Sequence, residues 1–148
     1  MKGLKEFEDL FLKFTAFKKN KYHPLVWILG EPEIGKNVSI GGFSEINASG
    51  ARVSIGNNCD IASFVSINCA DSHKKSIGLS KNESRKDINI ENNVFIGSHS
   101  VVKCGARIGH HSVVAAGTIV DGVNIPAYSL ISGNPMNIKS GYYKNKNK

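Results

Sequence analysis

His73 is the residue of this sequence whose type and position best suit chemistry. It stands at the start of a polar stretch, Lys74 to Asn89, that interrupts an otherwise regular pattern of aliphatic residues. A loop of this length inside a compact repeat is commonly either functional or disordered. An imidazole of ordinary pKa, about 6.5, can take up and return a proton at neutral pH. A single histidine is more often a surface residue than a catalytic one, so the surroundings of His73 must decide.

Asp71 is the acidic residue closest to His73 along the chain. Carboxylates commonly orient imidazole rings through one ring nitrogen. Asp71 therefore either orients His73 or serves only to solvate the loop, and the sequence leaves both interpretations open.

The elements that must position His73 are indicated by an aliphatic anchor at every sixth residue. The anchors fall in three runs, Ile28 to Ile46, Ile55 to Ile67 and Ile90 to Val120. The residue four places after an anchor is usually small, and we expect Asn124 to close the series. This period fits neither an α-helix nor a long strand and indicates a solenoid. We predict a triangular prism with three short strands in each coil of about 18 residues.

The regular spacing is broken twice before Ile90. From Ile46 to Ile55 the step is nine residues, which predicts a bulged corner over residues 48–52. After Ile67 the ladder stops, and we predict a loop insertion over residues 69–89.

We predict one domain, large enough for a continuous core. Residues 1–24 form an N-terminal amphipathic helix and linker, residues 25–138 the β-solenoid, and residues 139–148 a basic tail. The helix, over residues 4–17, carries an apolar face that we expect to pack on the solenoid or on a neighbouring subunit. Its members are spaced by three and four residues: Leu4, Phe7, Leu10, Phe11, Phe14 and Phe17.

Composition narrows the classes of function. The chain has 148 residues and a formal net charge of +7, which suits an anionic ligand such as a nucleotide phosphate. Interleaved aromatic platforms are lacking, which argues against a nucleic-acid partner. No apolar run is long enough to span a membrane, and charged residues break the N-terminal stretch, unlike a secretory signal. Three cysteines, an odd number without metal-like spacing, favour the cytoplasm.

Two hexads, Ile55-Gly56-Asn57-Asn58-Cys59-Asp60 and Ile108-Gly109-His110-His111-Ser112-Val113, resemble those of the hexapeptide-repeat acyltransferases. The resemblance covers about residues 28–138 and is of the sugar acetyltransferase type. It implies an all-β solenoid that is a left-handed parallel β-helix with a short N-terminal α-helix. It also implies a homotrimer whose active sites are shared between neighbouring subunits.

The resemblance also implies roles for particular residues. His73 matches the catalytic base, and Asn47, directly after the anchor Ile46, matches a residue that binds the acceptor sugar. Asn68 and Arg85 are further candidates for substrate binding, although Arg85 could equally be a solvent charge. Acetyl-CoA would lie against the outer surface of the C-terminal coils, with Lys139 in place of a lysine that relatives carry elsewhere. The candidates are Phe95, Gly97, Ser98, Ala116, Gly117 and Lys139.

We therefore expect an acetyl-CoA-dependent acetyltransferase that N-acetylates the amino group of a nucleotide-linked amino-deoxy sugar. O-acetylation of a sugar hydroxyl is the close alternative, because the same base serves both acceptors. From other classes, a metal enzyme of the γ-carbonic anhydrase type and a non-catalytic β-helix remain. The metal enzyme needs two histidines five residues apart, and the five histidines offer no such pair. We expect no metal.

Overall fold

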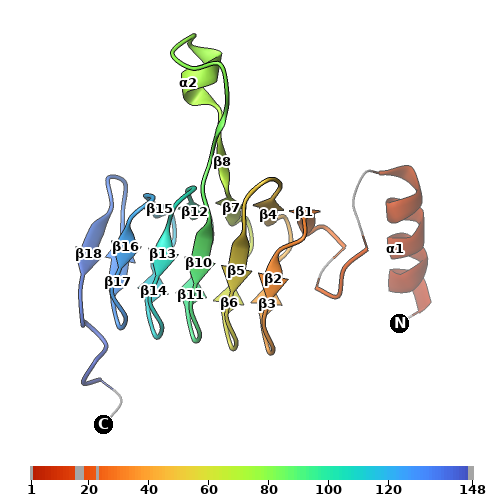
Figure 1. Cartoon of the computed structure of the whole chain (residues 1–148). Helices are drawn as coiled ribbons and strands as arrows, with labels where there is room; N and C mark the ends of the chain where they lie inside the picture. Colours follow the sequence, from red (N-terminus) through yellow and green to blue (C-terminus); the bar gives the residue numbers. More distant parts are fainter. Residues whose placement is uncertain (1, 16–18, 23, 147–148) are drawn as a thin grey trace.

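The protein folds as a parallel β-solenoid with a helix beyond its N-terminal end (Figure 1). The structure, a computed structural model, describes residues 2–15, 19–22 and 24–146. Helix α1 spans Lys2–Phe14, and the coils then follow one another in chain order. The three short strands of each coil belong to three different sheets, as the sixfold spacing predicted.

Each face of the prism is one sheet. Sheet A contains β1 (Trp27–Gly30), β4 (Glu45–Ala48), β7 (Ser66–Asn68), β12 (Val101–Val102) and β15 (Ile119–Val120). Sheet B contains β2 (Glu33–Ile34), β5 (Val53–Ile55), β10 (Ile88–Ile90), β13 (Arg107–Ile108) and β16 (Asn124–Ile125). Sheet C contains β3 (Ser39–Ile40), β6 (Asp60–Ile61), β11 (Phe95–Ile96), β14 (Val113–Val114), β17 (Leu130–Ser132) and β18 (Asn137–Lys139). The pairing is parallel except for β18, which returns antiparallel to β17 and includes Lys139, the first residue of the predicted tail.

The aliphatic anchors form the core. Those from Ile40 onward are at most 6% exposed, whereas Ile28 and Ile34, in the first coil, are half-buried. Small side chains fill the corners between anchors, and their hydroxyls bond to the main chain. Ser44 donates to the carbonyl of Ala62 at 3.0 Å. The predicted ladder is thus confirmed as the inward row of a packed interior.

The predicted place of Asn124, as the small inward residue four positions after the anchor Val120, was wrong. Asn124 is exposed, and Ile125, 1% exposed, takes the anchor position opposite Ile108. The corner before it is one residue short, because equivalent residues here lie 17 apart, compared with 18 between the preceding coils. The aliphatic row continues to Ile131, which is fully buried.

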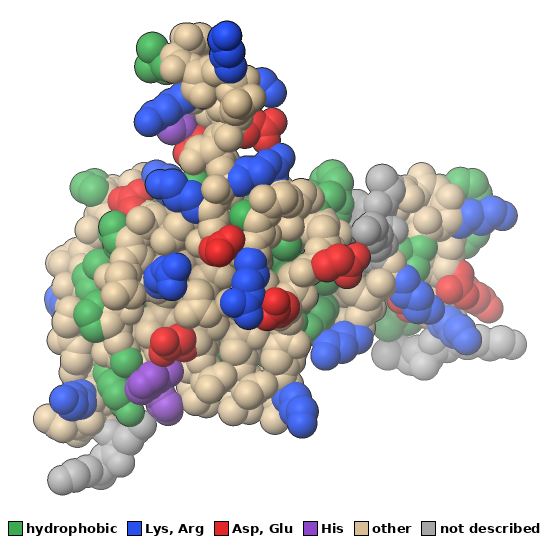
Figure 2. Space-filling model, viewed as in Figure 1, with side chains coloured by type: hydrophobic (Ala, Val, Ile, Leu, Met, Phe, Trp, Pro, Cys, Tyr) green, Lys and Arg blue, Asp and Glu red, His purple; other side chains and the backbone are tan. Residues whose placement is uncertain are grey.

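Two irregular corners lie one above the other where sheet A passes to sheet B. The first is the bulge at residues 49–52, where the coil spacing rises to 21. The second projects as a ribbon, built from the antiparallel strands β8 (Ala70–Asp71) and β9 (Ser84–Arg85) with the one-turn helix α2 (His73–Ser76) (Figure 1). Basic side chains gather on this ribbon and at its base (Figure 2). The ribbon begins at the predicted break.

The coils approach one another closely at the corners. A Cβ on Gly97 would lie 2.5 Å from the main-chain nitrogen of Ala116, and one on Gly109 would lie 2.4 Å from that of Ala127. Real Cβ atoms do not come so close to the main chain, so glycine at these two positions permits the stacking.

Helix α1 is shorter than predicted, and its apolar face is uncovered. The helix ends at Phe14, while Phe17, like His23, lies outside the described residues. The exposed fractions are 56% for Leu4 and 75% for Phe14, with Phe7 and Leu10 between 49% and 56%. These residues therefore do not pack on the solenoid of the same chain. In the part of the chain that the structure describes, no helix is both long and apolar enough to cross a bilayer.

The burial of two nearby isoleucines predicts that replacing each by alanine will lower the free energy of unfolding by different amounts. Ile108 is fully buried, whereas Ile119 points outward and is half-buried. We expect Ile108→Ala to lower the free energy of unfolding by about 2–5 kcal/mol, because a cavity adds to the lost burial. Ile119→Ala, the matched control, should cost clearly less in urea unfolding. Equal losses would mean that Ile108 does not belong to the core.

Candidate active site

Asp71 and His73 form a pair at the start of the projecting ribbon. Asp71 Oδ1 lies 2.5 Å from His73 Nδ1 and accepts a second hydrogen bond, at 3.1 Å, from the His73 main-chain N–H. Asp71 ends strand β8 and His73 begins helix α2, so the ribbon itself sets this geometry. The His73 side chain is 62% exposed, which leaves its ring accessible to a substrate.

This contact keeps the Asp71 carboxylate ionised and determines which ring nitrogen of His73 carries the proton. The hydrogen bond from the His73 ring, followed by that from its main chain, lowers the pKa of Asp71. The carboxylate is therefore ionised at neutral pH. The stabilisation that the contact provides is present above the pKa of an unfolded aspartate and is lost as pH falls through the lowered pKa. An ionised acid at Nδ1 favours a proton there, so Nε2 carries the free lone pair.

Asn47 and Asn68 are neighbours on the outer side of sheet A. They are partners in the register of β4 and β7. Each side-chain oxygen accepts from a main-chain N–H two residues on, Ser49 at 3.0 Å and Ala70 at 2.9 Å. These bonds shape the two irregular corners. Among the described residues neither amide group donates a hydrogen bond, which leaves both N–H donors for a ligand.

Lys103 extends the same row, and the sequence analysis missed it. It follows the anchor Val102 as Asn68 follows Ile67, so the hexad position was the available signal. Its Nζ lies 2.9 Å from Asp121 Oδ1, and this bond raises the pKa of Lys103. Its charge also acts weakly on Asp71. Lys103 is therefore a cation beside the His73 pair.

Arg85 has protein partners that account for its charge. Its guanidinium bonds to the carbonyl of Ser49 and, at 2.7 Å, to Glu83. These contacts tie the ribbon to the bulged corner below it. The two contacts therefore give Arg85 a structural role.

The residues predicted to hold the donor lie elsewhere on the prism. Ser98, Ala116 and Gly117 occupy the corners between sheets C and A, whereas Phe95 and Lys139 lie on sheet C. Gly97 is buried, and its N–H donates to Val114 at 2.8 Å. The resemblance implies that main-chain N–H groups near Gly97 and Ser98 stabilise the oxyanion formed when a thioester is attacked, and the Gly97 N–H is already occupied. The Ser98 N–H has no hydrogen-bond partner within the described chain and is the remaining candidate for that role.

The two sets of residues do not converge within one chain. Asp71 and His73 leave the corner between sheets A and B, while Ser98 and Gly117 stand at the other edge of sheet A. If both sets serve one reaction, a second copy of the chain must bring them together.

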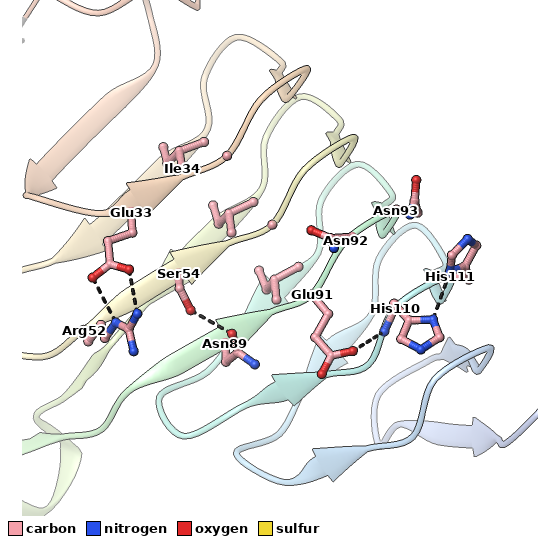
Figure 3. A pocket seen from close by; sticks show the side chains of 14 residues that line it. Glu33, Ile34, Arg52, Ser54, Asn89, Glu91, Asn92, Asn93, His110 and His111 are labelled. Carbon is pink, nitrogen blue, oxygen red and sulfur yellow. Dashed lines mark hydrogen bonds and ion pairs between the residues drawn. The ribbon is translucent and has the colours of Figure 1, made fainter.

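A broad groove of about 790 Å³ runs along sheet B, away from all predicted site residues (Figure 3). Its floor carries the Glu33–Arg52 ion pair, at 2.6 Å, and a bond from Ser54 to Asn89, at 2.8 Å. His110 and His111 lie at its rim with their Nδ1 atoms 2.9 Å apart. Over residues 2–15, 19–22 and 24–146, no three His, Cys, Asp or Glu side chains gather in a way that could hold a metal ion.

Comparisons with known proteins agree with this architecture. The family described as "Hexapeptide repeat of succinyl-transferase" matches residues 87–122. The galactoside O-acetyltransferase of Escherichia coli is 35% identical over 111 residues, which cover 70% of this chain and 54% of that enzyme. The chain spans between 31% and 54% of the length of the first curated relatives it matches.

Two solved structures extend the comparison. The polySia-specific acetyltransferase NeuO is 26% identical, with a TM-score of 0.64 over 84% of this chain and 64% of that one. A mutant of AntD, an N-acyltransferase from Bacillus cereus in complex with dTDP-4-amino-4,6-dideoxyglucose and coenzyme A, has a TM-score of 0.72 over 84% of this chain and 70% of that one. At 15% identity, that likeness concerns the fold alone.

The architecture is that of a left-handed parallel β-helix, as predicted. The chain belongs to the hexapeptide-repeat acyltransferase family.

The Asp71 contact predicts the tautomer of His73. In nitrogen-detected NMR at pH 8, the wild-type ring should be protonated at Nδ1, because the carboxylate accepts that proton. Asp71→Ala should abolish this bias. Glu83→Ala, which removes an acid of the same ribbon that contacts Lys75 and Arg85, should retain it. An unchanged tautomer in Asp71→Ala would show that the acid does not orient the ring.

Proposed function

We propose that the protein is an acetyl-CoA-dependent sugar acetyltransferase in which His73 acts as the general base. The observation that carries the proposal is the Asp71–His73 pair, which directs a free ring nitrogen outward from the one long insertion of the β-helix. Relatives named as sugar acetyltransferases support the class of reaction.

The reaction needs one proton to move from the acceptor to His73 and then from His73 to the departing thiolate. The acceptor gives its proton to Nε2 of His73 as its nitrogen or oxygen attacks the thioester carbonyl carbon. The carbonyl oxygen becomes an oxyanion, for which the Ser98 N–H is the candidate donor. The C–S bond then breaks and the imidazolium returns the proton to the thiolate. Asp71 stabilises the imidazolium between the two transfers and remains ionised.

Acetyl-CoA is proposed as the donor substrate, held by Phe95, Ser98, Ala116, Gly117 and Lys139. Small side chains at three of these positions let a thin chain lie close to the main chain. Related solved structures are complexes with acetyl-CoA or with coenzyme A. Because these residues and His73 lie at different corners, the proposal includes a homotrimer with closed symmetry and sites between neighbours. It assigns the reaction to the cytoplasm.

The proposed acceptor is the amino group of a nucleotide-linked amino-deoxy sugar. The net charge of +7 suits two anionic substrates. Asn47, Asn68 and Lys103 form a polar row beside the base that suits hydroxyl and phosphate groups.

A sugar hydroxyl is the second candidate acceptor. The relatives named for a sugar acceptor include two galactoside O-acetyltransferases, which are 35% and 32% identical to this chain. This observation favours a sugar hydroxyl as the acceptor more strongly than the sequence alone did.

Removing the base tests the proposal. His73→Ala should lower kcat for thiol release from acetyl-CoA by about a hundredfold or more, against both nucleotide-linked amino sugars and plain sugars. His110→Ala, which removes a half-buried histidine at the rim of the groove on sheet B, should leave kcat unchanged. Activity of His73→Ala equal to that of the wild type would refute the role of the base. Turnover of hydroxyl acceptors alone would refute the proposed amine.

Sharing of sites between copies is tested by mixing two inactive variants. His73→Ala removes the base, and Ala116→Trp blocks the donor surface. When both are refolded together in equal amounts, about one site in four should combine an intact base with an intact donor surface. Partial recovery of activity is therefore expected. If the mixture stays as inactive as each variant alone, base and donor surface belong to the same chain.

A further inference from the structure

An exposed column of aromatic rings follows the corner between sheets C and A and stops one coil short of its end. Phe43, Phe64 and His99 occupy equivalent positions in successive coils. Ring centroids are 5.1 Å apart for the first pair and 4.9 Å for the second, with interplanar angles of 6° and 7°. Phe43 is 60% exposed and Phe64 49%, so the column is an outer feature and not part of the core.

The next position in the column is Gly117, which has no ring to add. It stands two residues before Ile119, as His99 stands two residues before Val101, the register partner of Ile119. Its φ of 72° continues the left-handed values of 62°, 61° and 59° at Phe43, Phe64 and His99. A Cβ added there would meet nothing within 4 Å. The outer face of the His99 ring therefore borders an open gap at the height where a fourth ring would stack.

The gap has the shape of a binding slot for one flat ring. The backbone at Gly117 is held as in the other coils, since its N–H donates to Ser98 at 2.9 Å. Strand β15 is the last strand of sheet A, and the turn after β17 packs over it, since the Ile119 N–H donates to the Gly133 carbonyl at 3.2 Å. A flat ligand ring can enter the gap from the outer side of the corner and stack on His99 as the phenyl rings stack on each other.

We propose that His99 and Gly117 form a slot for the heteroaromatic base of a nucleotide. The proposal rests on the proposed function, in which the donor and the preferred acceptor each carry such a base. Stacking on an aromatic side chain is tolerant of base identity, so adenine of the donor and the base of the acceptor are both served by this chemistry. The slot extends the proposed donor surface, because it adds the His99 ring to the small residues that were proposed to bind acetyl-CoA.

Calorimetric binding to the full chain tests the slot with three probes: coenzyme A, acetyl-pantetheine, which lacks the base, and dTDP. His99→Ala removes the platform, and Gly117→Phe fills the gap with a ring of the protein. Each should weaken binding of coenzyme A or of dTDP about tenfold, and binding of acetyl-pantetheine should not change in His99→Ala. His99→Phe, which keeps a ring, should retain wild-type affinity. Phe43→Ala removes a ring remote from the slot and should have no effect.

Each outcome has one meaning. Loss confined to coenzyme A assigns the slot to the donor base, and loss confined to dTDP assigns it to the acceptor base. Unchanged affinity for both nucleotides in His99→Ala and Gly117→Phe overturns the proposal. A changed oligomeric state with unchanged affinities also overturns it and assigns the column to a contact between copies. Binding is measured without turnover, so a failure of the proposed reaction is detected separately through His73→Ala.

Discussion

Hydrogen bonds between successive coils hold neighbouring strands about 4.8 Å apart, and this repeat distance governs what each position of the prism can carry. Inside, it presses aliphatic anchors into a continuous core. At Gly97 and Gly109 it leaves no room for a side chain. Outside, it brings Phe43, Phe64 and His99 to a spacing at which parallel rings touch. One mechanical constraint thus produces the core, the corners and the outer column.

The same constraint separates the components of the candidate site. A regular coil returns each residue type to the same edge, so Asn47, Asn68 and Lys103 gather along one edge of sheet A. Ser98 and Gly117 gather along the other. A rigid prism cannot fold its two edges together. Chemistry that requires both edges therefore depends on a neighbour, which makes assembly a condition of the proposed activity.

Periodicity predicted most of the fold, because each anchor obeys the same inward geometry. It failed at Asn124, where one residue fewer in the corner shifts the inward position to Ile125. For the site, the role of His73 stays a prediction from the sequence, while its contact with Asp71, which the sequence left open, comes from the geometry of the ribbon. Arg85 appeared free in the sequence but is held by Ser49 and Glu83. Lys103 was missed because surface lysines are common, and its place directly after the anchor Val102 was the only signal in the sequence.

The bulge and the ribbon are joined so closely that they form a single module. Arg85 bonds to the Ser49 carbonyl, and the Arg52 N–H donates to Asp87 at 2.9 Å. The Ile88 N–H in turn donates to the Arg52 carbonyl at 2.9 Å. The ribbon therefore stands on the bulge and not on a regular corner. We therefore expect that the ribbon carrying His73 can be transferred to another β-helix only together with the three extra residues of the bulge, because these residues bind its base.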